Sequence, residues 1–150
     1  MNTLNTRTTR KTQAPRDRFS PIAAALLILL WAYAAVSKLL DFDQFRGELL
    51  NQAIPRETAY PLSWLLPLSE LSAAALLLFP KTEYRGFLLS ALLLTLFSGY
   101  IALVLLGFWE RIPCSCGGVL RHLGWGPHLV FNLAFLALSL AGVLQNHRRG

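Results

Sequence analysis

Residues 86–109 read GFLLSALLLTLFSGYIALVLLGFW and contain no Asp, Glu, Lys or Arg. A helix of roughly 20 apolar residues crosses the hydrocarbon core of a bilayer, which is about 30 Å thick, so this stretch predicts a membrane-spanning helix. Three further apolar runs lie at residues 21–40, 62–79 and 127–144, and their only charged residues are Lys38 and Glu70. The sequence therefore predicts an all-α integral membrane protein, a bundle of four helices.

The composition agrees with this fold class and limits the function. Of the 150 residues, 54% are hydrophobic and 15% are charged, and the formal net charge is +6. A basic soluble protein would suggest nucleic acid as a partner, but the basic residues here lie beside apolar runs, so we expect contact with the lipid bilayer and none with nucleic acid. The connections are too short for a soluble catalytic domain, so any chemistry must lie in the bundle or its loops.

The Lys and Arg residues predict the orientation, because cytoplasmic loops carry an excess of them. We expect both termini in the cytoplasm of a bacterial inner membrane, with residues 41–61 and 110–126 as the outer connections. Residues 1–20 are expected to form a disordered basic tail, 21–145 the membrane domain and 146–150 a second basic tail. The expected inner residues are Arg7, Arg10, Lys11, Arg16, Arg18, Lys81, Arg85, Arg148 and Arg149, and the outer ones are Lys38, Arg46, Arg56, Arg111 and Arg121.

The first outer connection alternates apolar and polar residues at helical spacing. Phe42, Phe45 and Leu49 fall on one face, with acidic and amide side chains opposite. This pattern predicts a short amphipathic helix in the membrane interface. Two roles fit such a helix: a lid over an outer cavity, or simply a bridge between two spans along the lipid headgroups. We favour the bridge. Pro61 is expected to open the second span after this connection.

The second outer connection holds both cysteines of the chain, Cys114 and Cys116, within PCSCGG at residues 113–118. Outside the cytoplasm such a pair meets an oxidising compartment. A disulfide closed across one intervening residue is strained, and a strained disulfide is more easily reduced. This favours a redox-active pair over two unremarkable loop cysteines or a local staple, since closing so short a loop removes little chain entropy.

A metal site is an alternative use of the same cysteines. Cys114, Cys116, His122 and His128 follow one another as C-x-C-x5-H-x5-H. Two thiolates and two imidazoles suit zinc or copper. The spacing matches no recognised zinc finger, so we favour the redox interpretation.

Three polar residues of the spans are predicted to form one cluster. Glu70 lies within the second span, where an ionisable group is costly and faces the bundle interior. Lys38 and Asn132, in the first and fourth spans, are expected at a similar depth. One role for the cluster is structural, as a polar contact that keeps the helices in register. The other makes Glu70 a catalytic proton acceptor, because a thiol needs a base to become a thiolate. Both roles stay open.

These residues also carry a family resemblance. AVSKLLDFDQF at residues 35–45 resembles a DoxX-type pattern, and LSEL at residues 68–71 resembles the second-span glutamate of that superfamily. PCSCGG at residues 113–118, together with Asn132, resembles the MauE branch, the methylamine-utilisation membrane proteins. The resemblance runs from about residue 20 to residue 145 and is most specific at the cysteine loop and at Lys38.

The resemblance implies a redox-associated membrane protein that assists disulfide formation or electron transfer for exported proteins, with a link to methylamine metabolism. We expect an exported thiol-containing or thioredoxin-like protein as the partner. A quinone is a candidate cofactor, because a chain with one cysteine pair must pass electrons directly to a quinone or to a partner. Trp109 and Trp125 flank the cysteine loop. They are expected either to anchor the helices in the membrane interface or to stack on a quinone ring. Two rival functions are a non-catalytic anchor of an oxidoreductase, as the DoxX name for a quinol oxidase subunit suggests, and metal handling. Whether the chain is an enzyme, a thiol-disulfide oxidoreductase, and what oligomer it forms stay open.

Overall fold

The computed structural model describes residues 19–52, 55–108 and 124–148. Residues 1–18 of the first predicted tail, residues 149–150 of the second, and the segment 109–123 that carries the predicted cysteine pair lie outside these residues. Residues 19–20 and 146–147, which were predicted as tail, belong to α1 and α5. In the described part the chain forms helices and no strands. The four long helices are α1 (Phe19–Leu40), α3 (Arg56–Leu78), α4 (Glu83–Leu105) and α5 (Trp125–His147), and a short helix, α2 (Phe42–Leu50), lies between the first two.

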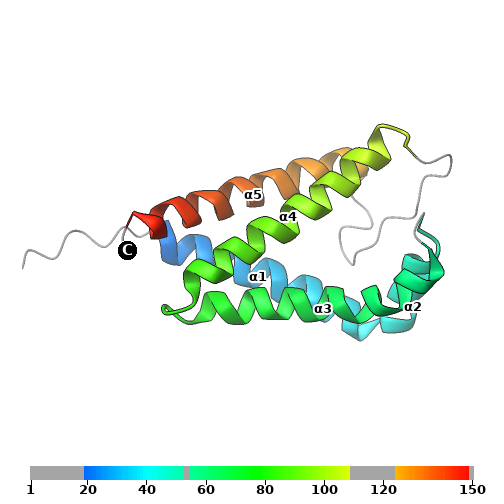
Figure 1. Ribbon diagram of the computed structural model, residues 1–150, viewed down its shortest axis with the longest axis horizontal. Coiled ribbons are helices and arrows are strands. Elements are labelled where there is room, and N and C mark those ends of the chain that lie inside the picture. The colour runs from blue at the N-terminus through cyan, green and yellow to red at the C-terminus, as the bar shows by residue number, and fades with distance from the viewer. Residues whose placement is uncertain (1–18, 53–54, 109–123, 149–150) are drawn as a thin grey trace, which may run out of the picture.

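Each long helix has the length and hydropathy needed to cross a bilayer, so the predicted all-α bundle with four spans is confirmed and the chain is a multi-pass membrane protein. In Figure 1, α1 and α3 lie along one side of the bundle and α4 and α5 along the other, while α2 lies where α1 ends and α3 begins. The short connection between α3 and α4, residues 79–82, makes these two helices antiparallel neighbours.

All four long helices begin before the apolar runs that predicted them, and α4 ends at Leu105, before its run ends at residue 109. α3 begins at Arg56 and not near residue 62, so Pro61 lies inside the helix instead of opening it. Pro55 is the N-cap residue, its carbonyl accepts hydrogen bonds from the N–H groups of Thr58 and Ala59, and Glu57 places a carboxylate in the first turn, where the helix dipole favours it. Backbone hydrogen bonding continues into the polar interface, where hydropathy no longer marks a helix.

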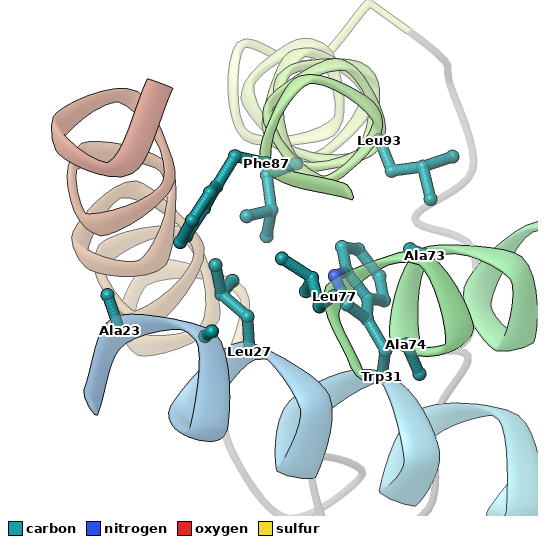
Figure 2. Close-up of a cluster of buried hydrophobic side chains, with 10 residues drawn as sticks. Ala23, Leu27, Trp31, Ala73, Ala74, Leu77, Phe87 and Leu93 are labelled. Carbon is teal, nitrogen blue, oxygen red and sulfur yellow. The ribbon is translucent and has the colours of Figure 1, made fainter. Parts of the chain in front are cut away.

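The core joins α1, α3 and α4 through side chains of very different size. Ala23 and Ala73 are fully buried, and small residues of this kind let helix backbones approach closely in a membrane. Larger side chains fill the space between the three helices. Figure 2 shows this cluster, with labels on Ala23, Leu27 and Trp31 of α1, Ala73, Ala74 and Leu77 of α3, and Phe87 and Leu93 of α4.

Gly86→Ala is expected to destabilise the bundle by about 1–3 kcal/mol, the usual range for overpacking a core. A Cβ at Gly86 would lie 2.7 Å from Cγ of Leu77 and 2.9 Å from the Leu77 backbone nitrogen, so α3 and α4 would have to separate. Unfolding of the purified protein in detergent micelles by heat or denaturant measures the change.

Gly99 in the same helix supplies the matched control. A Cβ at Gly99 would meet nothing within 4 Å, and alanine is about 0.5–1 kcal/mol better than glycine inside a helix. Gly99→Ala should therefore be neutral or stabilising. If the Gly86 and Gly99 variants unfolded alike, the close α3–α4 contact would be refuted.

Candidate functional site

A cavity of about 340 Å³ lies between the helices and is lined by residues of all five. Most of its walls are aliphatic or aromatic, and a few polar side chains reach it. Small-molecule sites in proteins are typically cavities of about 300–1,000 Å³ with this mixture of a largely apolar wall and few polar groups. The cavity is therefore the candidate functional site. Its polar and charged lining residues are Tyr33, Ser37, Lys38, Gln52, Glu70, Tyr100, His128 and Asn132.

An ion pair between α1 and α3 forms part of the wall. Nζ of Lys38 lies 2.8 Å from Oε1 of Glu70 and also donates a hydrogen bond of 3.2 Å to the carbonyl of Ala34, one turn earlier in α1. The exposed fractions of the two side chains are 12% for Lys38 and 1% for Glu70. Burial removes both charges from water, so each depends on the other for compensation.

Two polar atoms in the cavity wall are buried and have no hydrogen-bond partner among the described residues. They are Oε2 of Glu70 and Nδ1 of His128. A buried polar atom without a partner costs free energy, and such an atom in a native structure calls for a bound ligand, a solvent molecule or a strained function to explain it. Both atoms belong to residues that the sequence singled out.

Asn132 of α5 is buried and lines the same cavity. The structure thus brings the three predicted polar residues to one cavity, where the direct contact given within the described part joins Lys38 to Glu70. Catalytic or structural roles for these residues stay predictions.

The predicted residues Cys114, Cys116 and His122 lie outside the described residues. His128 is described and lies in the first turn of α5, where its N–H donates to the carbonyl of Gly124. The described residues contain no group of three or more potential metal ligands. Three members of the predicted metal set lie outside them, so the metal site stays a prediction.

The two helices that flank the cysteine segment in the sequence, α4 and α5, both line the cavity. Tyr100 and Ile101 line the cavity one turn before α4 ends at Leu105, and Trp125 and His128 line it where α5 begins.

The short helix α2 covers part of the same cavity. Phe45 and Leu49 are buried against Ala59 of α3 and also line the cavity. The ring of Phe42 lies 4.5 Å from that of Trp64. The predicted amphipathic helix therefore packs on the bundle and does more than bridge two spans along the headgroups.

Two hydrogen bonds at the site were not predicted from the sequence. Nε1 of Trp31 donates to Oγ of Ser90 at 2.8 Å, and the hydroxyl of Tyr100 donates to Oε1 of Gln52, which links the end of α2 to α4. A tryptophan in mid-span signals a buried partner, because its N–H cannot be left in hydrocarbon. Nothing in the sequence pairs Gln52 with Tyr100.

Comparison with known proteins gives one consistent family. The family model described as "Methylamine utilisation protein MauE" matches residues 16–145. The "Methylamine utilization protein MauE" of Methylorubrum extorquens is 35% identical over 122 residues, which are 79% of this chain and 64% of that protein. The protein of the same name from Paracoccus versutus is 32% identical over 131 residues, 84% of this chain and 70% of the relative. The chain thus covers less than two thirds of the length of the first relative. No solved structure matches the chain.

Proposed function

The chain belongs to the MauE family of methylamine utilisation proteins, and from this premise we propose that it transfers disulfides to exported thiol proteins through Cys114 and Cys116. The observation that supports the proposal is a membrane cavity with a buried Lys38–Glu70 pair, lined by α4 and α5, the helices that precede and follow the cysteine segment in the sequence. The names of the relatives suggest a methylamine pathway as the setting.

The proposed exchange proceeds in two balanced steps. A thiolate of the exported partner attacks one sulfur of the Cys114–Cys116 disulfide, so this S–S bond breaks and a mixed disulfide forms. A second partner thiolate then attacks the mixed disulfide, which forms the partner's S–S bond and releases the pair as a dithiol. Two electrons pass from the partner to this chain. Thiolates are the attacking species in both steps.

Glu70 is the proposed proton acceptor for this chemistry. Its Oε1 is occupied by Lys38, whereas Oε2 lies in the cavity wall without a described hydrogen-bond partner. A carboxylate oxygen in this position can take a proton from a thiol directly or through one water molecule. Asn132 and Lys38 are proposed to position the carboxylate.

The cysteines are expected to be accessible from the outer side of the membrane and oxidised there. A membrane-impermeant maleimide added to intact spheroplasts should label the chain after treatment with a reductant and leave it unlabelled without reductant. Cys114 and Cys116 are the only cysteines of the chain, so any label reports on this pair. Gel mobility and mass spectrometry measure the labelling.

A variant with a single cysteine on the opposite side supplies the control. Lys81→Cys, combined with serine at both natural positions, places the thiol in the connection between α3 and α4, where Lys81 is exposed. This variant should be labelled only after the membrane is permeabilised. The reverse pattern, with Cys114 and Cys116 reached only after permeabilisation, would overturn the orientation and the oxidising setting of the exchange.

A further inference from the structure

We propose that the cavity between the five helices binds a lipid-soluble quinone and the corresponding quinol. The inference goes beyond disulfide exchange and is argued from the described residues of the cavity alone. It therefore holds or fails independently of Cys114 and Cys116.

The walls suit a flat ring. The residues that line the cavity include six aromatic side chains, and the rings of Trp31 and Phe97 lie 6.3 Å apart at an interplanar angle of 47°. Aromatic rings prefer offset or tilted contacts with one another. A quinone ring in the cavity could make such a contact with the Trp31 or Phe97 ring. The six are Trp31, Tyr33, Phe45, Phe97, Tyr100 and Trp125.

The charges of the cavity favour a neutral ligand. Two of the described lining residues carry a charged Lys, Arg, Asp or Glu side chain, namely Lys38 and Glu70. They pair with each other at 2.8 Å. A charged ligand would add a charge without compensation to an apolar site, which is costly. The further titratable side chains among the described lining residues are those of His128, Tyr33 and Tyr100. Phosphates, carboxylates and ammonium compounds therefore fit less well than a neutral polar ring.

The polar atoms of the cavity serve both redox forms of a quinone. The Lys38 ammonium has three N–H donors, of which described contacts use two, to Glu70 and to the Ala34 carbonyl. The remaining donor can bind a quinone oxygen. Oε2 of Glu70, which has no described partner, can accept a hydrogen bond from a quinol hydroxyl. A purely hydrocarbon ligand would leave these atoms unsatisfied.

The cavity can be entered from the lipid. Tyr33 of α1 and Leu96 of α4 both line it, and their exposed fractions are 46% and 60%. On membrane-spanning helices, exposed apolar residues face the hydrocarbon chains of the bilayer, which is where a lipid-soluble quinone is dissolved. A bound quinone would accept two electrons and two protons to become a quinol, the number released when two thiols form one disulfide.

Binding of ubiquinone-1 to the purified full-length protein in lipid nanodiscs tests the proposal. The fluorescence of Trp31 and Trp125, which line the cavity, should be quenched saturably by one equivalent. Ala34 also lines the cavity, so Ala34→Phe places a ring inside it and should weaken binding at least tenfold. The matched control is Ala25→Phe, at an exposed position of the same helix outside the cavity, which should bind like the wild type.

A second measurement on the wild type does not depend on the folding of a variant. A photoreactive azidoquinone should label peptides of the cavity wall, such as the one that contains Tyr33, and ubiquinone-1 should compete with it. The proposal is overturned if labelling spreads evenly over lipid-facing residues, or if a folded Ala34→Phe variant binds as tightly as the wild type. Equal competition by decanol, which has no ring, would identify a site for alkyl chains and would also overturn it.

Discussion

Replacement of either Cys114 or Cys116 by serine is expected to abolish disulfide transfer to an exported partner. The exchange requires two sulfurs in this chain, because one is attacked and the other leaves and later re-forms the bond. The two single variants should nevertheless differ. The variant that keeps the attacked sulfur should trap the partner as a mixed disulfide, visible on a non-reducing gel, and the other should trap nothing. Mass spectrometry of the trapped species identifies the partner.

The residue between the cysteines supplies a control for this experiment. Ser115→Ala changes the same short segment and leaves both sulfurs in place, so transfer should continue.

Full activity of a variant with serine at both cysteine positions would refute the exchange and leave a non-catalytic anchoring subunit as the better account. A trapped partner from a methylamine pathway would tie the exchange to the setting that the relatives' names suggest. One equivalent of tightly bound zinc or copper, lost when His122 and His128 are replaced, would move the chemistry to a metal site.

Glu70→Leu is expected to lower the free energy of unfolding by about 3–5 kcal/mol, the cost of removing one partner from a buried ion pair. The variant leaves the Lys38 ammonium, whose side chain has an exposed fraction of 12%, without its carboxylate at 2.8 Å. The double variant Lys38→Met with Glu70→Leu removes both charges and should recover most of the loss, since an apolar pair of similar volume often replaces a buried ion pair at little cost. The free energy of unfolding in micelles is measured for four proteins: the wild type, the two single variants and the double variant. Together these values form a double-mutant cycle.

An exposed ion pair of the same chain is the control for this cycle. Arg46 and Asp43 of α2 lie 3.4 Å apart, and the exposed fraction of the Asp43 side chain is 93%, so Asp43→Asn should change stability by less than about 1 kcal/mol. Wild-type stability of Glu70→Leu would show that the buried pair contributes nothing to folding.

Glu70→Gln separates the two roles left open for the carboxylate. Glutamine keeps the shape and an oxygen acceptor for Lys38 but cannot take a proton from a thiol. A variant that folds like the wild type and has lost disulfide transfer would identify Glu70 as the proton acceptor. Retained transfer would make the pair a structural contact between α1 and α3.

The fold class and the number of spans could be predicted from the sequence alone. Long apolar runs must become helices in a bilayer, because a helix satisfies its own backbone hydrogen bonds where no water can do so. The same cost argument singled out Lys38, Glu70 and Asn132 before any packing was considered. The motifs around Lys38 and the cysteines also indicated the family. Helix ends were less well predicted, as Pro61 shows, because α3 begins in the polar interface where hydropathy changes sign.

Which helix faces meet, and what lies between them, depends on the tertiary packing. Lipid chains are as apolar as a protein core, so hydropathy does not distinguish a buried Leu77 from an exposed Leu78 on the same helix. The direct contact of Lys38 with Glu70 and the bond from Trp31 to Ser90 depend on how α1 is rotated and placed against α3 and α4. The cavity depends on all five helices at once. No local pattern can specify such a space, because its volume is what remains after side chains distant in the sequence have packed.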